Sequence, residues 1–158
     1  MRAVDLKKEH SFIDQYVDLR NSYTELLFTS RVSRADTEKW LAGQDVEVLG
    51  LAEGDALLGV AVLYPGKEGE IAFFVKYRNR GIGTRLLALI EDAARSRGLP
   101  FVRAWTLKDN AIAQRVFEKS GFEREGIQKR VRGGAAHEGV AYKKKLGKDK
   151  GGIPLPVI

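Results

Sequence analysis

The residues best suited to chemistry stand in the segment from Ile71 to Leu87, where an apolar run passes through a basic turn into an amphipathic stretch. The turn contains the pattern RxxGxG, which runs from Arg78 through Gly81 to Gly83. Glycines allow the backbone to bend tightly, and the amide N–H groups at the start of a helix point outward. Because a helix start and nearby arginines both attract anions, the spacing predicts a site for a pyrophosphate.

Other phosphate-binding patterns are missing from the chain. The sequence contains no GxxxxGK[ST] loop, and the dinucleotide pattern GxGxxG fails because Leu86 stands where its third glycine belongs. The RxxGxG pattern alone is weak, since at average glycine usage it arises by chance in on the order of one chain in ten. Its significance comes from its place between a predicted strand and a predicted helix.

Two segments of the chain resemble the GCN5-related N-acetyltransferases, the GNAT superfamily. The RxxGxG turn is similar to their acetyl-CoA pyrophosphate loop, and residues 110–122 are similar to their asparagine-led helix, which ends in a Gly-Phe step. A strand-like run over residues 101–107 separates the two segments, as the family's order requires. The resemblance covers residues 56–146. It implies an enzyme that uses acetyl-CoA as co-substrate and acetylates a primary amine.

The same resemblance implies an α/β fold of the α+β kind, in which helices flank a mixed, mostly antiparallel central sheet. The hydrophobic pattern predicts elements that fit this fold. Strands are expected over residues 1–6, 46–52, 56–64, 69–76, 101–107, 122–131 and 139–146, and helices over residues 10–21, 33–41, 81–97 and 110–120. We expect residues 1–146 to form one domain and residues 147–158 to form a basic, flexible tail.

Composition supports one globular domain and excludes several functions. The chain has 158 residues, of which 44% are hydrophobic and 30% are charged, as is ordinary for a globular protein. No apolar run reaches the ~18 residues of a membrane span, and no secretory signal is recognisable at the N-terminus. We therefore expect a cytoplasmic protein with no membrane partner. The chain has no cysteine, which excludes disulfides and thiolate metal sites, and we expect no metal cofactor.

The net charge of +6 does not indicate a nucleic-acid partner, because most of it is local. Residues 143–158 contain five lysines and one aspartate and so contribute +4. A short lysine run at the end of a strand is usually a solvated edge or tail. No recognition helix or base-stacking motif accompanies it. We expect no nucleic-acid binding, while a monomer and a homodimer both stay open.

The resemblance assigns cofactor contacts to the strand, the turn and the later helix. The strand and the turn would contribute Phe73, Val75, Arg78, Arg80, Gly81, Ile82, Gly83 and Thr84. Asn110 would hydrogen-bond the pantetheine arm of acetyl-CoA, and Phe117 would lie two turns further along that helix, near the acetyl thioester. Both have structural alternatives. Asp109 is a good N-cap with Asn110 just inside the helix, and Phe117 fits a core aromatic residue.

Glu70 is the candidate catalytic base. A lysine-like amine has a pKa near 10.4, so a carboxylate or an ordered water must remove a proton before the amine can attack. On a strand, the side chains of Glu70 and Phe74 face one side and those of Phe73 and Val75 face the other. The resemblance implies a backbone N–H further along that stabilises the thioester oxygen, and we place this donor at Phe74. The alternative for Glu70 is a solvated carboxylate at the strand end.

One departure from the family pattern concerns the proton donor. Many members have a tyrosine where this chain has Phe117, and that tyrosine protonates the departing thiolate. Phenylalanine cannot donate a proton, so the general acid is unassigned.

A second departure is that the link before the turn is shorter than usual, which leaves the cofactor contacts of Lys76 and Tyr77 open. Without cysteine an acetyl-cysteine intermediate is excluded, and we expect direct attack in a ternary complex of enzyme, acetyl-CoA and amine.

The acceptor amine is the part of the reaction that the sequence constrains least. Arg20, Tyr23 and Tyr142 are the candidates for binding it, with solvation of the arginine and packing of Tyr142 as alternatives. Residues 19–28 and Trp40 loosely resemble enzymes of the ribosomal-protein and amino-sugar-nucleotide type. The favoured acceptor is a small-molecule amine or an amino-sugar nucleotide. The alternatives are a protein N-terminus or lysine, and a non-catalytic acyl-CoA-binding sensor that lacks the usual tyrosine.

Overall fold

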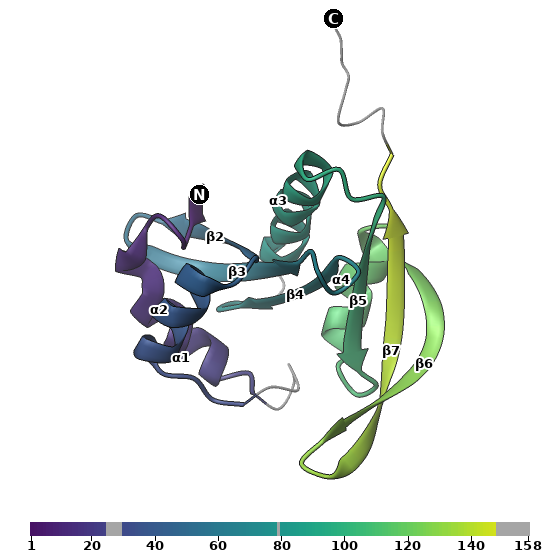
Figure 1. Cartoon of the computed structure of the whole chain (residues 1–158). Helices are drawn as coiled ribbons and strands as arrows, with labels where there is room; N and C mark the ends of the chain where they lie inside the picture. Colours follow the sequence, from purple (N-terminus) through teal and green to yellow (C-terminus); the bar gives the residue numbers. More distant parts are fainter. Residues whose placement is uncertain (25–29, 79, 148–158) are drawn as a thin grey trace, which may run out of the picture.

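The computed structural model describes residues 1–24, 30–78 and 80–147, which form a seven-stranded sheet with helices on both faces (Figure 1). In chain order the elements are β1 (Arg2–Asp5), a 3-10 turn (His10–Phe12), α1 (Ile13–Asn21), α2 (Arg34–Gly43), β2 (Glu47–Glu53), β3 (Ala56–Tyr64), β4 (Glu70–Val75), α3 (Ile82–Ser96), β5 (Phe101–Leu107), α4 (Ala111–Lys119), β6 (Glu123–Arg132) and β7 (Ala135–Lys145). The strand order is β1-β2-β3-β4-β5-β7-β6, and every pairing is antiparallel except that of β4 with β5. The predicted fold class is confirmed.

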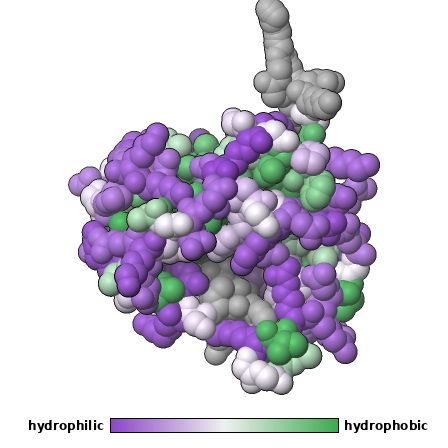
Figure 2. All heavy atoms as spheres, in the orientation of Figure 1, coloured by the Kyte–Doolittle hydropathy of each residue, from purple (hydrophilic) through white to green (hydrophobic). Residues whose placement is uncertain are grey.

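Each face of the sheet has its own hydrophobic core. α3 packs on one face, where Leu86, Leu87 and Ile90 are completely buried. α1 and α2 cover the other face, around Tyr16 and Phe74. Figure 1 shows α1 and α2 on the side of β3 and β4 that is away from α3, and Figure 2 shows polar residues over most of the surface in view. The central strands are therefore covered on both faces, and alternate side chains of β4 reach different cores.

Local sequence signals determine where two of the helices begin. Ser33 caps α2 through a capping box, in which its hydroxyl accepts from the Asp36 N–H at 3.0 Å and the Asp36 carboxylate accepts from the Ser33 N–H at 3.4 Å. α3 begins after Gly81, whose φ of 72° is left-handed and suits glycine. The tight turn predicted at the glycines of the RxxGxG pattern is confirmed at Gly81.

Some element boundaries differ from the predicted ones. The helix predicted over residues 10–21 begins as the 3-10 turn, and β7 begins at Ala135 instead of residue 139. The two-residue turn Gly133-Gly134 has φ of 60° and 80°, the combination that joins hairpin strands tightly. Pairing therefore propagates directly from this turn through Ala135–Glu138, although this stretch lacks an apolar alternation. Apart from Gly147, the predicted tail lies outside the described residues.

Gly139 of β7 permits close approach of the Trp105 indole ring, and a side chain there should destabilise the fold. A Cβ at this position would overlap the ring. The Trp105 Nε1–H also donates to the Gln128 carbonyl at 2.9 Å, so the ring has little room to move. Gly139→Ala should lower the free energy of unfolding in urea by about 1–3 kcal/mol. Gly43→Ala is the control, since a Cβ there meets no atom within 4 Å, and equal stability of the two variants would contradict this prediction.

Candidate active site

The site begins where the parallel ladder between β4 and β5 ends. These strands pair only at Glu70 with Arg103 and at Ile71 with Ala104, whereas β4 stays paired with β3 along its whole length. Successive residues of a strand direct their backbone N–H and C=O groups to opposite sides. Beyond Ile71, β4 therefore presents a backbone edge that no neighbouring strand of the described residues covers.

The register decides which amides face this uncovered edge. The Lys76 N–H donates to the Leu58 carbonyl at 2.8 Å, so Lys76 faces β3. Two residues earlier, the Phe74 amide also faces β3, where Phe74 lies opposite Val60. The amides of Phe73 and Val75 face the edge that leads toward β5. The placement of the oxyanion donor at Phe74 is therefore corrected, because the alternation of the strand turns that amide away from the open edge.

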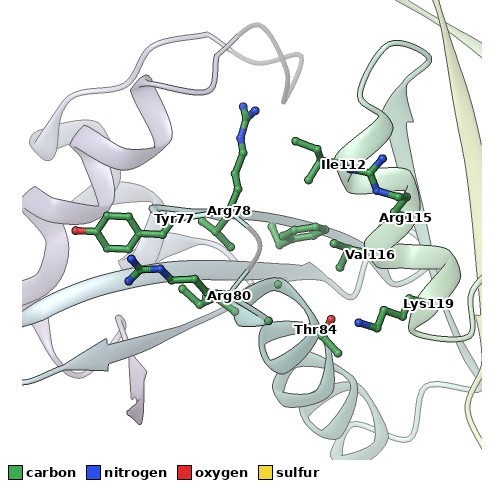
Figure 3. A pocket seen from close by; sticks show the side chains of 13 residues that line it. Tyr77, Arg78, Arg80, Thr84, Ile112, Arg115, Val116 and Lys119 are labelled. Atoms are coloured by element: carbon green, nitrogen blue, oxygen red, sulfur yellow. The ribbon is translucent and has the colours of Figure 1, made fainter.

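A cleft of about 400 Å³ lies between the turn before α3 and the exposed face of α4 (Figure 3). Of the residues predicted to bind the cofactor, it is lined by Phe73, Val75, Arg78, Arg80, Gly81, Ile82, Gly83 and Thr84. No side chain of the described residues caps the start of α3, so within residues 1–24, 30–78 and 80–147 the first N–H groups of this helix have no side-chain acceptor. A Cβ on Gly83 would lie 3.0 Å from the Phe73 ring, which explains a glycine at this close contact.

α4 supplies the opposite wall of the cleft, which the sequence prediction missed. Its contributions are Ile112, Arg115, Val116 and Lys119, and Tyr77 joins them from the turn. The four α4 positions follow the i, i+3, i+4, i+7 spacing of one helix face, a signal that the sequence already contained. Figure 3 shows Arg115 and Lys119 across the cleft from the turn. Together with Arg78 and Arg80 they make the lining basic, and the lining within the described residues includes no carboxylate.

A smaller cavity of about 40 Å³ adjoins the cleft, between β4 and the start of α4. It shares Phe73, Val75, Arg78 and Ile112 with the larger cleft, and Asn110 and Tyr23 also line it. Asn110 itself caps α4, because its Oδ1 accepts from the Ala113 N–H at 3.2 Å. The cap predicted at Asp109 is thus one residue too early. The amide N–H₂ of Asn110 is a donor beside the cavity, so capping and ligand binding are compatible.

Two of the predicted site residues lie in the core. Phe117 is 3% exposed and meets Phe73 edge to face at 5.3 Å, so it lies behind the cleft wall and does not line either cavity. Tyr142 is completely buried, and it stacks on Phe117 at 5.5 Å. Its hydroxyl donates to Glu118 at 2.7 Å, and burial, with this hydrogen bond, raises the pKa of Tyr142 to about 12. The acceptor-binding role of Tyr142 is therefore corrected, because the ring has no surface for a ligand.

Glu70 lies on the other face of the sheet from the cleft, beneath the β6–β7 hairpin. Its carboxylate accepts two hydrogen bonds from the Arg130 guanidinium, at 2.6 and 3.2 Å. This guanidinium lies 4.7 Å from the centre of the Trp105 ring. Carboxylate oxygens have further lone pairs, so Glu70 can still accept a hydrogen bond from a ligand or a water molecule. The predicted base is thus fixed in orientation by an arginine.

The other two acceptor-binding candidates lie at the end of α1. Arg20 donates to the Ser30 carbonyl at 2.7 Å and so connects α1 to the chain that leads to α2. The Tyr23 hydroxyl donates to the Val75 carbonyl at 2.5 Å, on the uncovered edge of β4. Of the segment 19–28 singled out from the sequence, residues 25–28 lie outside the described residues. Tyr23 therefore lines the smaller cavity, whereas Arg20 bonds to the segment before α2.

The described residues contain neither a membrane-spanning helix nor a cluster of metal ligands. No helix among the described residues is long and apolar enough to span a membrane. The same residues contain no group of three or more His, Cys, Asp or Glu side chains that could hold a metal ion. The features that could bind a ligand in this region are the basic cleft and the uncovered edge of β4.

Solved structures share this fold across nearly the whole chain. A ribosomal-protein-alanine N-acetyltransferase from Brucella melitensis aligns with a TM-score of 0.80 and 21% identity, over 92% of this chain and 100% of that one. A Salmonella typhimurium protein solved with its cofactor acetyl-CoA aligns at 0.78 and 17%, over 92% and 95%. A phosphinothricin acetyltransferase from Sinorhizobium meliloti, in complex with acetyl-CoA, aligns at 0.76 and 16%, over 94% and 90%.

The sequence itself matches the pattern of the acetyltransferase (GNAT) family over residues 9–122. This match includes β4, the turn before α3 and all of α4, which border the cleft. The chain therefore belongs to the GNAT family of acetyltransferases, enzymes that use acetyl-CoA as co-substrate.

Proposed function

We propose that the protein transfers an acetyl group from acetyl-CoA to a primary amine by direct attack in a ternary complex. The observation on which this depends is the uncovered edge of β4, which leads from the basic cleft to the point where Ile71 pairs with Ala104 of β5. An extended, amide-bearing arm can bond to such an edge as a missing strand would. The cleft holds the charged end of the cofactor and the edge aligns its reactive end.

The basic turn suits the pyrophosphate of acetyl-CoA. The start of α3 offers N–H groups that no side chain of the described residues caps. Arg78, Arg80, Arg115 and Lys119 line the cleft in front of it. From there the pantetheine arm would pass Val75 first and Phe73 last, with the Asn110 amide beside it. The thioester then lies nearest Phe73. The Phe73 N–H is the donor proposed for the thioester oxygen, and such a donor contributes about 3 kcal/mol when it is aimed at the developing charge.

The acceptor amine would approach from the face of the sheet that bears Glu70. Arg130 fixes the carboxylate, and a proton from the amine can reach it directly or through a water molecule. The amine nitrogen then attacks the thioester carbon, and the thiolate of CoA leaves. Because the two substrates use opposite faces of β4, both can be bound at once, as a direct transfer requires.

The acceptor proposed is a small-molecule amine or an amino-sugar nucleotide. Support for a protein N-terminus as the second candidate comes from the Brucella melitensis enzyme, which is named for acetylating alanine of a ribosomal protein. A third possibility, a sensor that binds acyl-CoA without turnover, follows from the phenylalanine at position 117. These three differ in what they acetylate, so one assay separates them.

Release of CoA thiol should be measured with acetyl-CoA and a panel of amines. The panel contains polyamines, amino acids, amino-sugar nucleotides and peptides that begin with alanine, and the cysteine-free protein adds no thiol background. We expect turnover with a small amine or an amino-sugar nucleotide. Turnover with peptides alone would favour the protein acceptor. If no amine of the panel causes release of CoA thiol, while calorimetry shows that acetyl-CoA binds, the result would contradict catalysis and favour the sensor.

Gly81→Val should weaken acetyl-CoA binding about tenfold or more. A β-branched residue at a left-handed position is strained by about 1–3 kcal/mol, and the turn would relax away from the geometry that presents the helix start. Gly98→Val is a matched control, because Gly98 has φ of 75° and lies after the other end of α3, away from the cleft. Both variants should lose stability. Only Gly81→Val should lose affinity, and equal affinities in calorimetry would remove the turn from the cofactor site.

Glu70→Gln should lower kcat about 100-fold while acetyl-CoA affinity stays unchanged, because glutamine keeps the shape and cannot take a proton. Glu68→Gln is the control, since that side chain is 71% exposed and lies two residues away on the same stretch. Steady-state kinetics with the best amine of the panel compare the two. A kcat that does not fall in Glu70→Gln would exclude Glu70 as the base.

A further inference from the structure

The reaction needs a proton for the leaving group, and the residues assigned so far do not supply one. When the amine nitrogen bonds to the acetyl carbon, the C–S bond breaks and the sulfur leaves as a thiolate, which departs more readily if a positioned acid protonates it. Phe117 has no exchangeable proton and is buried behind Phe73. Glu70 lies on the other face and acts by accepting a proton. This question rests on the proposed function.

Tyr23 places a hydroxyl in the inner cavity, on the uncovered edge of β4. Its ring lines the inner cavity together with Phe73, Val75 and Asn110. Its hydroxyl donates to the Val75 carbonyl at 2.5 Å, and this carbonyl belongs to the same uncovered edge of β4 as the Phe73 amide. The hydroxyl therefore bonds a residue two positions along the strand from Phe73, on the side from which the arm enters. A rotation of the O–H about its C–O bond redirects the proton without movement of the ring.

The other polar residues of the inner cavity are unsuited to donate a proton. Arg78 stays protonated in proteins, and the amide of Asn110 is not an acid in water. The Asn110 oxygen is also used as the cap of α4. The remaining lining residues are apolar. Among the described residues that line this cavity, Tyr23 is thus the one with a hydroxyl group.

The surrounding structure holds the Tyr23 ring in place from two sides. The ring packs on Phe74 at 6.4 Å, and Phe74 packs in turn on the buried Tyr16 at 5.6 Å. The Tyr23 N–H donates to the Arg20 carbonyl at 3.0 Å, which ties the residue to the end of α1. A donor held by packing and by its own backbone is already oriented before the substrate binds, as effective acid catalysis requires.

We propose that Tyr23 is the general acid of the transfer and so replaces the tyrosine that position 117 lacks. As the C–N bond forms and the C–S bond breaks, the Tyr23 hydroxyl gives its proton to the sulfur, and CoA leaves as the neutral thiol. The acceptor nitrogen loses one proton to Glu70 or to water. Water in the cleft returns a proton to the tyrosinate. One proton thus passes overall from nitrogen to sulfur, and no atom changes its oxidation state.

Tyr23→Phe tests the proposal, because it removes the hydroxyl and keeps the packed ring. With acetyl-CoA and the most active amine of the panel, kcat should fall about 100-fold or more, while the KM and Kd for acetyl-CoA change little. Tyr142→Phe is the control, since it removes a buried hydroxyl that bonds Glu118 and lines neither cavity of the site, and its kcat should match the wild type. A kcat for Tyr23→Phe within threefold of the wild type would overturn the proposal.

A second acyl donor separates acid catalysis from a purely structural role of the hydrogen bond to Val75. p-Nitrophenyl acetate loses a stable phenolate that needs no proton, so Tyr23→Phe and the wild type should use it equally well after subtraction of the uncatalysed rate. An equal loss with both donors would mean that Tyr23 only positions β4, and the proposal would fall. Wild-type protein that acetylates no amine would instead overturn the proposed function itself, and the two failures are therefore distinguishable.

Discussion

The early end of the β4–β5 ladder is the constraint on which the site depends. Beyond Ile71 the backbone groups of β4 that face β5 lose their strand partners. Unpaired backbone groups that become buried cost about 1–3 kcal/mol each, so this edge favours any ligand that can bond to it. The Tyr23 hydroxyl already bonds to one carbonyl of the edge. The sheet thus creates binding capacity by leaving its own pairing incomplete.

β4 and β5 meet where two antiparallel halves of the sheet adjoin. β4 is the last strand of the half that runs from β1, and β5 is paired along its length with β7 in the other half. Side chains close the junction on the face opposite the cleft. Arg130 of β6 bonds both oxygens of Glu70, and Arg132 donates to the Thr24 carbonyl at 3.2 Å. The two halves are therefore held together at the point where the acceptor is proposed to bind.

Short-range patterns were sufficient for much of the fold and for the basic turn. The capping box at Ser33 and the left-handed Gly81 both depend on residues that are close in the chain, and the tight turn at Gly81 was predicted from the sequence. The apolar face of α3 is likewise a local periodicity, with Leu86 and Ile90 buried as expected. The lining of the larger cleft by Arg78 and residues 80–84 follows for the same reason, because they lie close together in the chain. The helix starts, the turn and the apolar helix face depend on local conformation, and residues close together in the sequence determine that conformation.

The sequence by itself therefore determined the family, the elements and the loop that faces the cofactor. The tertiary structure decided which groups meet there. The direction of the Phe74 amide depends on the register with β3, the burial of Tyr142 depends on packing against α4, and the bond from Tyr23 to Val75 joins residues 52 positions apart. Register and packing arise only when distant segments pair, and one residue of shift along a strand reverses which side each amide and side chain faces.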